Sequence, residues 1–267
     1  MQISLDRFSG GKSKALTMSY DDGVFSDIRL IEIFNKYRIK GTFHINSGLF
    51  GKKAWLRLPE NEIKKVYEGH EIAAHGYTHQ GLAFTPNEGI ISEVMRDREK
   101  LEEIVEKPIR GMSYALGSVN DNVVHMLRML GIDYCRVVPT THEFGLPDDF
   151  LQWQGTCHHN DNLLMYGDKF LSQDWHQLMY VWGHSYEFDN DHNWELIEEF
   201  CKKTGGRDDI WYATNIEICD YVKAVRGLRF TAKQDVVLNP SAYDVWISVD
   251  GNPVEIKSGK VVQLSKI

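Results

Sequence analysis

The segment Ala15–Gly23 reads ALTMSYDDG, an apolar run that stops at two adjacent carboxylates and a glycine. Such a run predicts a buried β-strand that leads into a polar loop. A helix with Ser26 as its N-cap is expected next, because apolar side chains then recur at helical spacing: Ile28, Ile31, Ile33, Phe34 and Tyr37. A second strand is expected at 41–46, so the chain begins as strand, helix and strand.

The same alternation continues toward the C-terminus. We expect further strands at 71–75, 110–114, 134–138, 178–184 and 210–214. Helices are expected at 59–69, at 85–105, at 120–130, at 194–201 and after Thr214, with capping boxes at Thr85 and Thr214. Residues 139–176 show no clear pattern. Strands that alternate with helices favour a parallel sheet, either in a closed or partly closed barrel or in an open doubly wound arrangement.

The composition is that of one globular α/β domain. The 267 residues are 42% hydrophobic and 25% charged, which gives enough apolar surface for a large core. The net charge of -8 argues against a nucleic-acid or anionic-membrane partner, since both bind clustered Lys and Arg. Four cysteines without a CxxC pair predict reduced thiols. The first residues lack the apolar run of a secretory signal, so we expect a cytoplasmic protein.

From about residue 226 the pattern changes to short β-rich runs. The runs VVLNP, YDVWISV, PVEIK and KVVQL are separated by Asn-Pro, Asp-Gly and Ser-Gly turn signals. We therefore expect a main catalytic domain over residues 1–225 and a small β-rich extension over residues 226–267.

Polar side chains that can carry chemistry follow the ends of three predicted strands. They are Asp21, Asp22, His75, His79 and His184. Because the carboxyl ends of parallel strands lie on the same face, we expect these side chains to converge into one site.

The spacing in HGYTH allows His75 and His79 to reach one metal ion if the segment turns, with Asp22 as an oxygen ligand. Two histidines and one carboxylate form a known catalytic zinc set that leaves a position open for water. A lone HxxxH is more often a pair of ordinary loop histidines. The adjacent Asp21 and Asp22 favour the metal, because two carboxylates repel one another unless a cation or a shared proton offsets the repulsion.

Three motifs occur in the order found in one enzyme family. They are SYDDG (Ser19–Gly23), HGYTH (His75–His79) and GHSYEF (Gly183–Phe188), and they resemble the first, second and last motifs of the polysaccharide deacetylase, or NodB-homology, family. Three motifs in sequence are far more specific than any one of them alone. The resemblance implies a deformed (β/α) barrel in which Asp22, His75 and His79 hold one divalent metal, usually zinc.

The resemblance also implies the roles of the remaining residues. Asp21 would act as the base toward the attacking water, and His184 as the general acid toward the leaving nitrogen or oxygen. The backbone N–H of Leu116 would stabilise the oxyanion, with Tyr114 beside it at the substrate.

The third motif departs from the family pattern, which is Arg-x-Pro-aromatic-Gly. The matching stretch is SYALG (Ser113–Gly117), in which Ser113 replaces the arginine and the glycine is retained. If this alignment holds, Ser113 lies beside Asp21 and the base lacks its usual cationic partner. Arg110 could take that part, although a solvated or salt-bridged strand residue is the more frequent role for such an arginine.

Other polar residues have plainer interpretations. Glu187 could orient His184, but a surface salt bridge is the more frequent role. His44 and the pair His158–His159 could face the site, yet single histidines are more often hydrogen-bonded within the fold. Asp174-Trp175 resembles a fragment of the family's fourth motif, and a solvent-facing Asp beside a packing Trp is equally frequent.

These observations predict a metal-dependent hydrolase that removes N-acetyl or O-acetyl groups from a carbohydrate or small amide. One alternative is a cyclic-amide hydrolase on the same scaffold. Another is a carbohydrate-binding relative that has lost catalysis. A binding protein needs neither a base nor a general acid, so the presence of Asp21 and His184 favours the enzyme.

Overall fold

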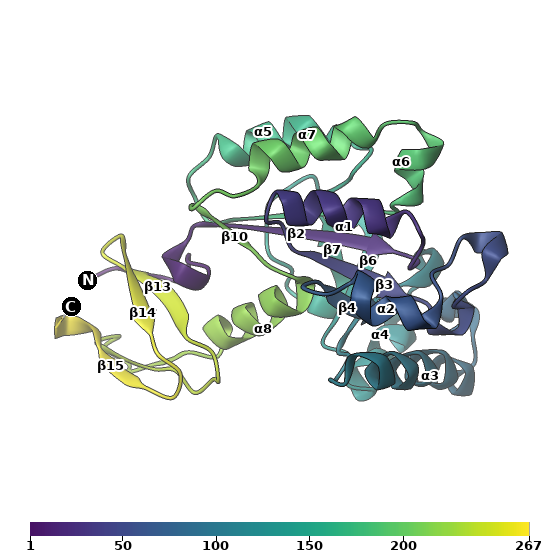
Figure 1. Cartoon of the computed structure of the whole chain (residues 1–267). Coiled ribbons are helices and arrows are strands. Elements are labelled where there is room, and N and C mark those ends of the chain that lie inside the picture. Colours follow the sequence, from purple (N-terminus) through teal and green to yellow (C-terminus); the bar gives the residue numbers. More distant parts are fainter. Residues whose placement is uncertain (267) are drawn as a thin grey trace.

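The computed structural model describes residues 1–266, and at its centre is a nine-stranded sheet (Figure 1). Its strands are β2 (Lys14–Asp21), β3 (Gly41–Ile45), β4 (Glu71–Ala74), β5 (Gly111–Ser113), β6 (Tyr134–Thr140), β7 (Trp153–Gly155), β8 (Cys157–His158), β9 (Gln177–Gly183) and β10 (Ile210–Tyr212). Their order is β7-β6-β5-β4-β3-β2-β9-β8, with β10 also paired to β2. Every pairing in this sheet is parallel. The predicted parallel α/β architecture is confirmed.

The sheet closes on itself through β7 and β8. Only Thr156 separates these two strands, yet β7 pairs with β6 while β8 pairs with β9. The N–H of Thr156 donates to the carbonyl of Tyr180 (2.7 Å), which continues the pairing across the gap. The result is the deformed barrel that the resemblance implies, and the open doubly wound arrangement is excluded. Both closing strands lie in the segment 139–176, where the sequence shows no clear pattern.

Helices cover most of the outside of the barrel. They are α1 (Asp27–Lys36), α2 (Glu60–Val66), α3 (Asn87–Val105), α4 (Asp121–Met129), α5 (Leu163–Leu171), α6 (Tyr186–Asn190), α7 (Trp194–Thr204) and α8 (Asn215–Arg226). In Figure 1, α1, α5 and α7 form a layer above the sheet, while α3 and α4 lie below it. The amphipathic pattern explains this placement, because α1 buries Leu30, Ile31, Ile33 and Phe34 against the barrel.

Two of the three predicted helix caps are wrong. Thr214 and Glu217 do form a capping box at the start of α8. The hydroxyl of Thr85, in contrast, donates back to the carbonyl of Gly81 (2.9 Å), and α3 begins after Pro86 without a side-chain cap. Ser26 precedes α1 but its hydroxyl donates to Asp189 instead (2.6 Å). In both cases a tertiary or turn contact takes the hydroxyl away from the helix terminus.

The C-terminal extension forms two small antiparallel sheets beside the barrel. It contains β11 (Arg229–Phe230), β12 (Val236–Leu238), β13 (Val245–Val249), β14 (Asn252–Ile256) and β15 (Val261–Gln263). The N-terminal strand β1 (Ile3–Ser4) pairs with β13, so both termini lie at this end of the molecule (Figure 1). A second core of side chains such as Phe8, Val245 and Ile247 joins the extension to α8. None of the helices in residues 1–266 combines the length and the apolar character needed to cross a membrane.

Candidate active site

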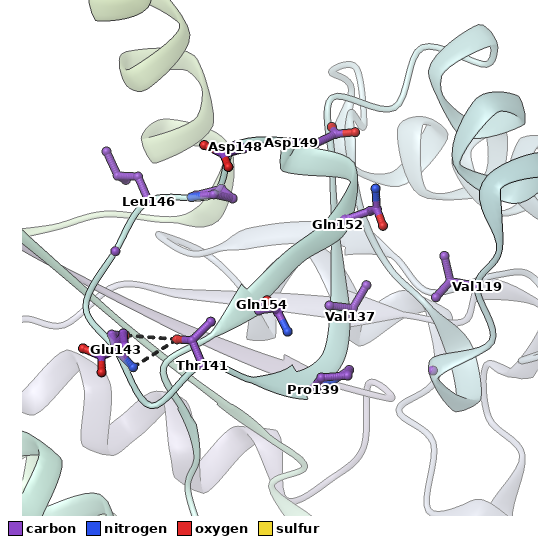
Figure 2. A pocket seen from close by; sticks show the side chains of 13 residues that line it. Val119, Val137, Pro139, Thr141, Glu143, Leu146, Asp148, Asp149, Gln152 and Gln154 are labelled. Atoms are coloured by element: carbon purple, nitrogen blue, oxygen red, sulfur yellow. Dashed lines mark hydrogen bonds between the residues drawn. The ribbon is translucent and has the colours of Figure 1, made fainter.

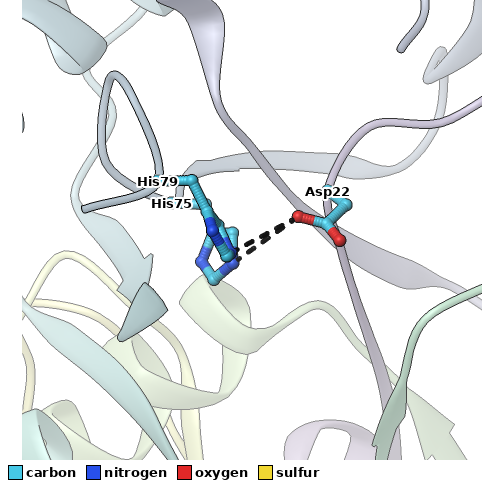
Figure 3. Close-up of side chains that lie close together, drawn as sticks. All are labelled: Asp22, His75 and His79. Carbon is cyan, nitrogen blue, oxygen red and sulfur yellow. Dashed lines mark ion pairs between the residues drawn. The ribbon is translucent and has the colours of Figure 1, made fainter. Parts of the chain in front are cut away.

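The predicted site residues gather where β2, β4 and β9 end. Asp21 is the last residue of β2 and Asp22 follows it, while His75 follows β4 and His184 follows β9. Parallel pairing of these strands places their carboxyl ends together, as expected for a barrel of this kind. Figure 3 shows the imidazoles of His75 and His79 side by side, facing the Asp22 carboxylate.

Asp22, His75 and His79 have the geometry of a metal centre. Asp22 Oδ1 lies 3.9 Å from Nε2 of His75 and 3.7 Å from Nε2 of His79, and one ligand atom from each residue lies within 4.8 Å of the others. Asp22 Oδ1 is buried and accepts no hydrogen bond from the described residues. Burial lowers the pKa of His75 to about 4 and also lowers that of His79, so both imidazoles are neutral at pH 7. Neutral imidazoles and an unsatisfied carboxylate oxygen fit a divalent cation.

A tight turn after β2 presents the Asp22 carboxylate. Asp22 has φ 91° and Gly23 has φ 67°, so the chain reverses within two residues of the strand end. A Cβ on Gly23 would approach a methyl of Ile45 to 2.8 Å. Both the left-handed backbone and the close approach therefore require glycine at this position.

Helix α3 holds the loop that carries His75 and His79. Asp97 Oδ2 accepts the N–H of His75 (2.9 Å), and one turn earlier Glu93 accepts both the N–H (2.8 Å) and the hydroxyl (2.6 Å) of Thr78. Glu93 and Asp97 are both buried. Two buried acids on one helix face thus fix the loop that positions the two candidate metal ligands.

Asp21 lies inside the barrel in its charged form. It forms an ion pair with Arg136, and Oδ1 lies 3.1 Å from the hydroxyl of Ser113 and 3.2 Å from Nδ1 of His44. Burial alone would raise the pKa of Asp21, but Arg136, His75 and His44 together hold it well below its usual range. Asp21 is therefore an acceptor of hydrogen bonds and protons at neutral pH.

Ser113 links Asp21 to His75, one of the candidate metal ligands. Its hydroxyl donates to Asp21, so it can only accept at Nδ1 of His75, which lies 2.7 Å away. Nδ1 of His75 then carries the hydrogen, and its Nε2 presents a lone pair toward Asp22. Ser113 lies beside Asp21 as the alignment of the third motif requires.

The cationic partner of Asp21 is Arg136, and Arg110 does not fill that role. Arg110 pairs with Asp133 (2.7 Å) and Asp220 (2.5 Å), which is the salt-bridged role expected of a strand arginine. Arg136 is 1% exposed, and its guanidinium lies 4.2 Å from the centre of the Trp182 ring. One signal in the sequence was available: an arginine within the buried run YCRVV requires a buried anion.

His184 is held by Glu187 at the start of α6. Its main-chain N–H donates to Glu187 Oε2 (3.0 Å), and its Nδ1 lies 3.4 Å from Oε1. Burial by itself would lower the pKa of His184, but Glu187 and Asp21 raise it above the usual value. The Glu187 side chain is 25% exposed and also contacts His158, so it belongs to a partly buried network and is not a surface salt bridge.

His158, His184 and Glu187 are also close enough to hold an ion. Nδ1 of His158 accepts the N–H of Asn160 (3.2 Å), so its Nε2 carries the hydrogen and lies 3.2 Å from Glu187 Oε2. A nitrogen that carries hydrogen cannot ligate a metal. The second cluster is therefore interpreted as histidine side chains gathered around the Glu187 carboxylate.

The predicted oxyanion residues differ in their surroundings. Leu116 lies in the turn after β5 with φ 57°, and its side chain is 74% exposed. The N–H of Tyr114 already donates to Arg136 O (3.1 Å), and its hydroxyl donates to Leu151 O (2.9 Å). Both donors of Tyr114 are thus engaged in the fold, and the predicted roles of Leu116 at the oxyanion and of Tyr114 at the substrate stay predictions.

Asp174, from the fragment that resembles the fourth motif, lies away from the site. It is 96% exposed in its side chain and pairs with Lys14 (3.2 Å), the first residue of β2. The site lies at the other end of that strand, so Asp174 takes no part in it.

Two hollows differ in their relation to the site. The larger, about 640 Å³, lies against β6 and β7, where a loop and no α-helix joins the two strands. Figure 2 shows its lining of side chains such as Val137, Pro139, Gln152 and Gln154, none of which is a candidate site residue. The other hollow, about 380 Å³, includes Asp22 and His79 in its lining. The smaller hollow therefore borders the candidate metal site.

The sequence resembles known deacetylases over part of its length. Residues 9–135 match the family model described as polysaccharide deacetylase. A chitin deacetylase from Arthroderma benhamiae is 33% identical over 98 residues, which is 36% of this chain and 24% of that protein. The chain thus spans about a quarter of the length of this curated relative.

Solved structures share the fold. A Mycobacterium smegmatis protein, described provisionally as a polysaccharide deacetylase, has a TM-score of 0.62 at 17% identity, covering 85% of this chain and 96% of its own. The Xyl-CE4 domain of a multidomain xylanase from the hindgut metagenome of Trinervitermes trinervoides has a TM-score of 0.53 at 17% identity, covering 90% and 100%. A CE4 family pseudoenzyme from Bacillus anthracis has a TM-score of 0.51 at 14% identity, covering 77% and 65%. Residues 9–135 are thus similar in sequence to the polysaccharide deacetylase family, and the chain shares the barrel fold of these solved structures.

Proposed function

We propose that the protein is a metal-dependent hydrolase that removes acetyl groups, N-linked or O-linked, from a carbohydrate or small amide. The observation that carries this proposal is the meeting of two sets of residues at one end of the barrel. Asp22, His75 and His79 form a site for a divalent metal, most suitably zinc. Asp21 and His184 provide a charged base and a histidine with a raised pKa beside it.

The residues divide the reaction between them. A bound divalent metal would supply Lewis-acid activation of water and of the acyl oxygen. Asp21 accepts the proton of the attacking water, and Arg136 together with Ser113 keeps its carboxylate charged and oriented. The raised pKa of His184 favours its protonated form, which donates the proton to the departing nitrogen or oxygen. The N–H of Leu116 is proposed as a donor to the oxyanion.

The main alternative is a relative that binds carbohydrate without hydrolysing it. Its support is the altered third motif and the fold shared with a CE4 pseudoenzyme. The chemistry of the site argues against this alternative. Arg136 supplies the positive charge that the arginine at the motif position, here Ser113, would otherwise supply. A buried carboxylate tuned in this way has no use in a pure binding site.

Acetate release decides between the alternatives. We suggest incubating purified protein with zinc and a panel of N-acetylglucosamine oligomers, O-acetylated xylo-oligosaccharides, small acetamides and cyclic amides. Release of acetate that is lost in Asp21→Asn supports the deacetylase. Ring opening without acetate release would indicate the cyclic-amide hydrolase. Saturable sugar binding with no turnover of any substrate would indicate the inactive relative.

A further inference from the structure

The cationic side chain of Arg57 contacts Asp22, the carboxylate among the candidate metal ligands. The Arg57 guanidinium donates from Nη1 to the main-chain oxygen of Asp22, and its Nη2 lies 2.9 Å from Asp22 Oδ1. That contact is outside hydrogen-bond geometry, and Oδ1 is the same oxygen that faces Nε2 of both His75 and His79. Arg57 is 6% exposed and Asp22 8%, so the two charges meet with little solvent around them.

Main-chain pairing fixes the backbone of this arginine. Segment 56–58 pairs with segment 23–25, directly after Asp22, through main-chain hydrogen bonds of 2.9 and 3.0 Å. Val24 and Arg57 form the antiparallel bridge between the two segments. Any rearrangement on metal binding must therefore come from the arginine side chain.

The side chain has space in which to move. The hollow of about 380 Å³ beside the metal centre is lined by Arg57 itself and by the polar residues Tyr186 and Asn190. Arg57 Nε is buried and makes no hydrogen bond within residues 1–266. The guanidinium is thus only partly satisfied in its present position, and polar side chains form part of the lining of the space next to it.

We propose that Arg57 is a built-in competitor of the metal ion. Its guanidinium contacts the Asp22 oxygen that a divalent cation would take, and binding of the cation displaces the guanidinium toward the hollow. This inference rests on the proposed function, because it takes Asp22, His75 and His79 as the metal ligands. Two positive groups that share one carboxylate oxygen repel each other strongly at short range in a site with little water. Arg57 therefore weakens cation binding, and its charge offsets the repulsion between Asp21 and Asp22.

The affinity of the metal-free protein for Zn²⁺ tests this competition. We suggest a titration in competition with a chromophoric chelator, for the wild type, Arg57→Met, Arg57→Gln and Arg57→Lys. Arg128→Met is the matched control, because it also removes one positive charge but from an exposed pair with Asp149. We expect Arg57→Met and Arg57→Gln to bind Zn²⁺ at least about tenfold more tightly than the wild type. Arg57→Lys and Arg128→Met should remain within a few-fold of it.

Thermal melting of the same proteins provides a second readout. Without metal, Arg57→Met should melt below the wild type, and saturating Zn²⁺ should raise its Tm by more than it raises the wild-type Tm. Unchanged or weaker Zn²⁺ binding in both neutral variants would overturn the competition and leave Arg57 as a residue that only positions Asp22. If neither the wild type nor these variants bind Zn²⁺ more tightly than His79→Ala does, the proposed metal centre itself fails. The two failures are thus distinguishable.

Discussion

Arg136 on β6 forms a buried ion pair with Asp21 at the end of β2, across the interior of the barrel. This pair stands in for the arginine that the third motif lacks, because Ser113 occupies the motif position and contacts the same carboxylate. Asp21, the proposed base, thus keeps a cationic partner, although the arginine comes from a different strand. The consequences for pH dependence, metal binding and stability can be measured.

Loss of the Arg136 charge should move the acid limb of activity to higher pH. Arg136 lowers the pKa of Asp21, so Arg136→Met should raise it, and the base will then be protonated at pH values where it is now charged. The pH profile of kcat/KM measures this shift, and Arg136→Lys should shift less because it keeps the charge. An acid limb that stays in place in Arg136→Met, with metal bound, would show that Arg136 does not tune Asp21.

The same pair should contribute to stability above the unfolded-state pKa of Asp21. A carboxylate whose folded pKa is depressed stabilises the fold above that value, and the contribution is lost as the pH falls through the folded pKa. Removing one partner of a buried pair typically costs about 3–5 kcal/mol. Denaturant unfolding of Arg136→Met at pH 7 should show a loss of this order. A loss below about 1 kcal/mol would place the pair in the range of exposed ion pairs.

Ser113→Ala should weaken metal binding by about tenfold, because Ser113 fixes the tautomer and orientation of His75. We expect the loss of metal affinity to be near the lower end of the range usual for removing a hydrogen-bond partner of a ligand. The reason is that Nδ1 of His75 also lies 3.1 Å from the main-chain carbonyl of Ser113, which remains in the variant. Chelator competition measures the affinity, with Ser172→Ala, which changes an exposed serine at the end of α5, as the control. Equal affinities in all three proteins would remove Ser113 from the support of the metal site.

Glu187→Gln should lower the pKa of His184, because the Glu187 carboxylate raises it. A general acid with a lower pKa loses its proton earlier as the pH rises, so the basic limb of kcat/KM should move to lower pH. Glu195→Gln, which changes an exposed glutamate on α7, is the control.

His184→Ala should retain the metal and lose about 10²–10⁴-fold in turnover, and the loss should be smaller for substrates with good leaving groups. Normal turnover in His184→Ala would contradict the role of general acid.

The residues at strand ends could be predicted from the sequence because their signals are local. The apolar run before Asp21 and the spacing of His75 and His79 each lie within a few neighbouring residues. A parallel arrangement then brings the strand ends together without further information. This part of the site and the α/β class therefore followed from patterns alone, while closure into a barrel came from the resemblance.

The remaining features depend on contacts between distant residues. Arg136 lies 115 positions from Asp21 in the chain, so only the fold brings them together. The closing strands β7 and β8 are three and two residues long, too short to carry a period of alternating side chains. Arg57 reaches Asp22 from a loop with no motif of its own. Such contacts could be found only after the three-dimensional structure was known.

The metal centre can be tested by removing a ligand. His79→Ala takes away one of three ligands, so both the metal content of the purified protein and its turnover should fall sharply. Elemental analysis of the wild type and the variant measures the first, and acetate release the second. Full metal occupancy in His79→Ala would place the ion elsewhere in the protein.

The most direct test of the account is a titration of metal-free protein with Zn²⁺ while acetate release from N-acetylglucosamine oligomers is followed. The account predicts no release from the metal-free protein and activity that rises to a plateau at one ion per chain, since Asp22, His75 and His79 form one site. Acetate release that is already complete without metal, or that is absent at every Zn²⁺ concentration and with every acetylated substrate, would contradict it.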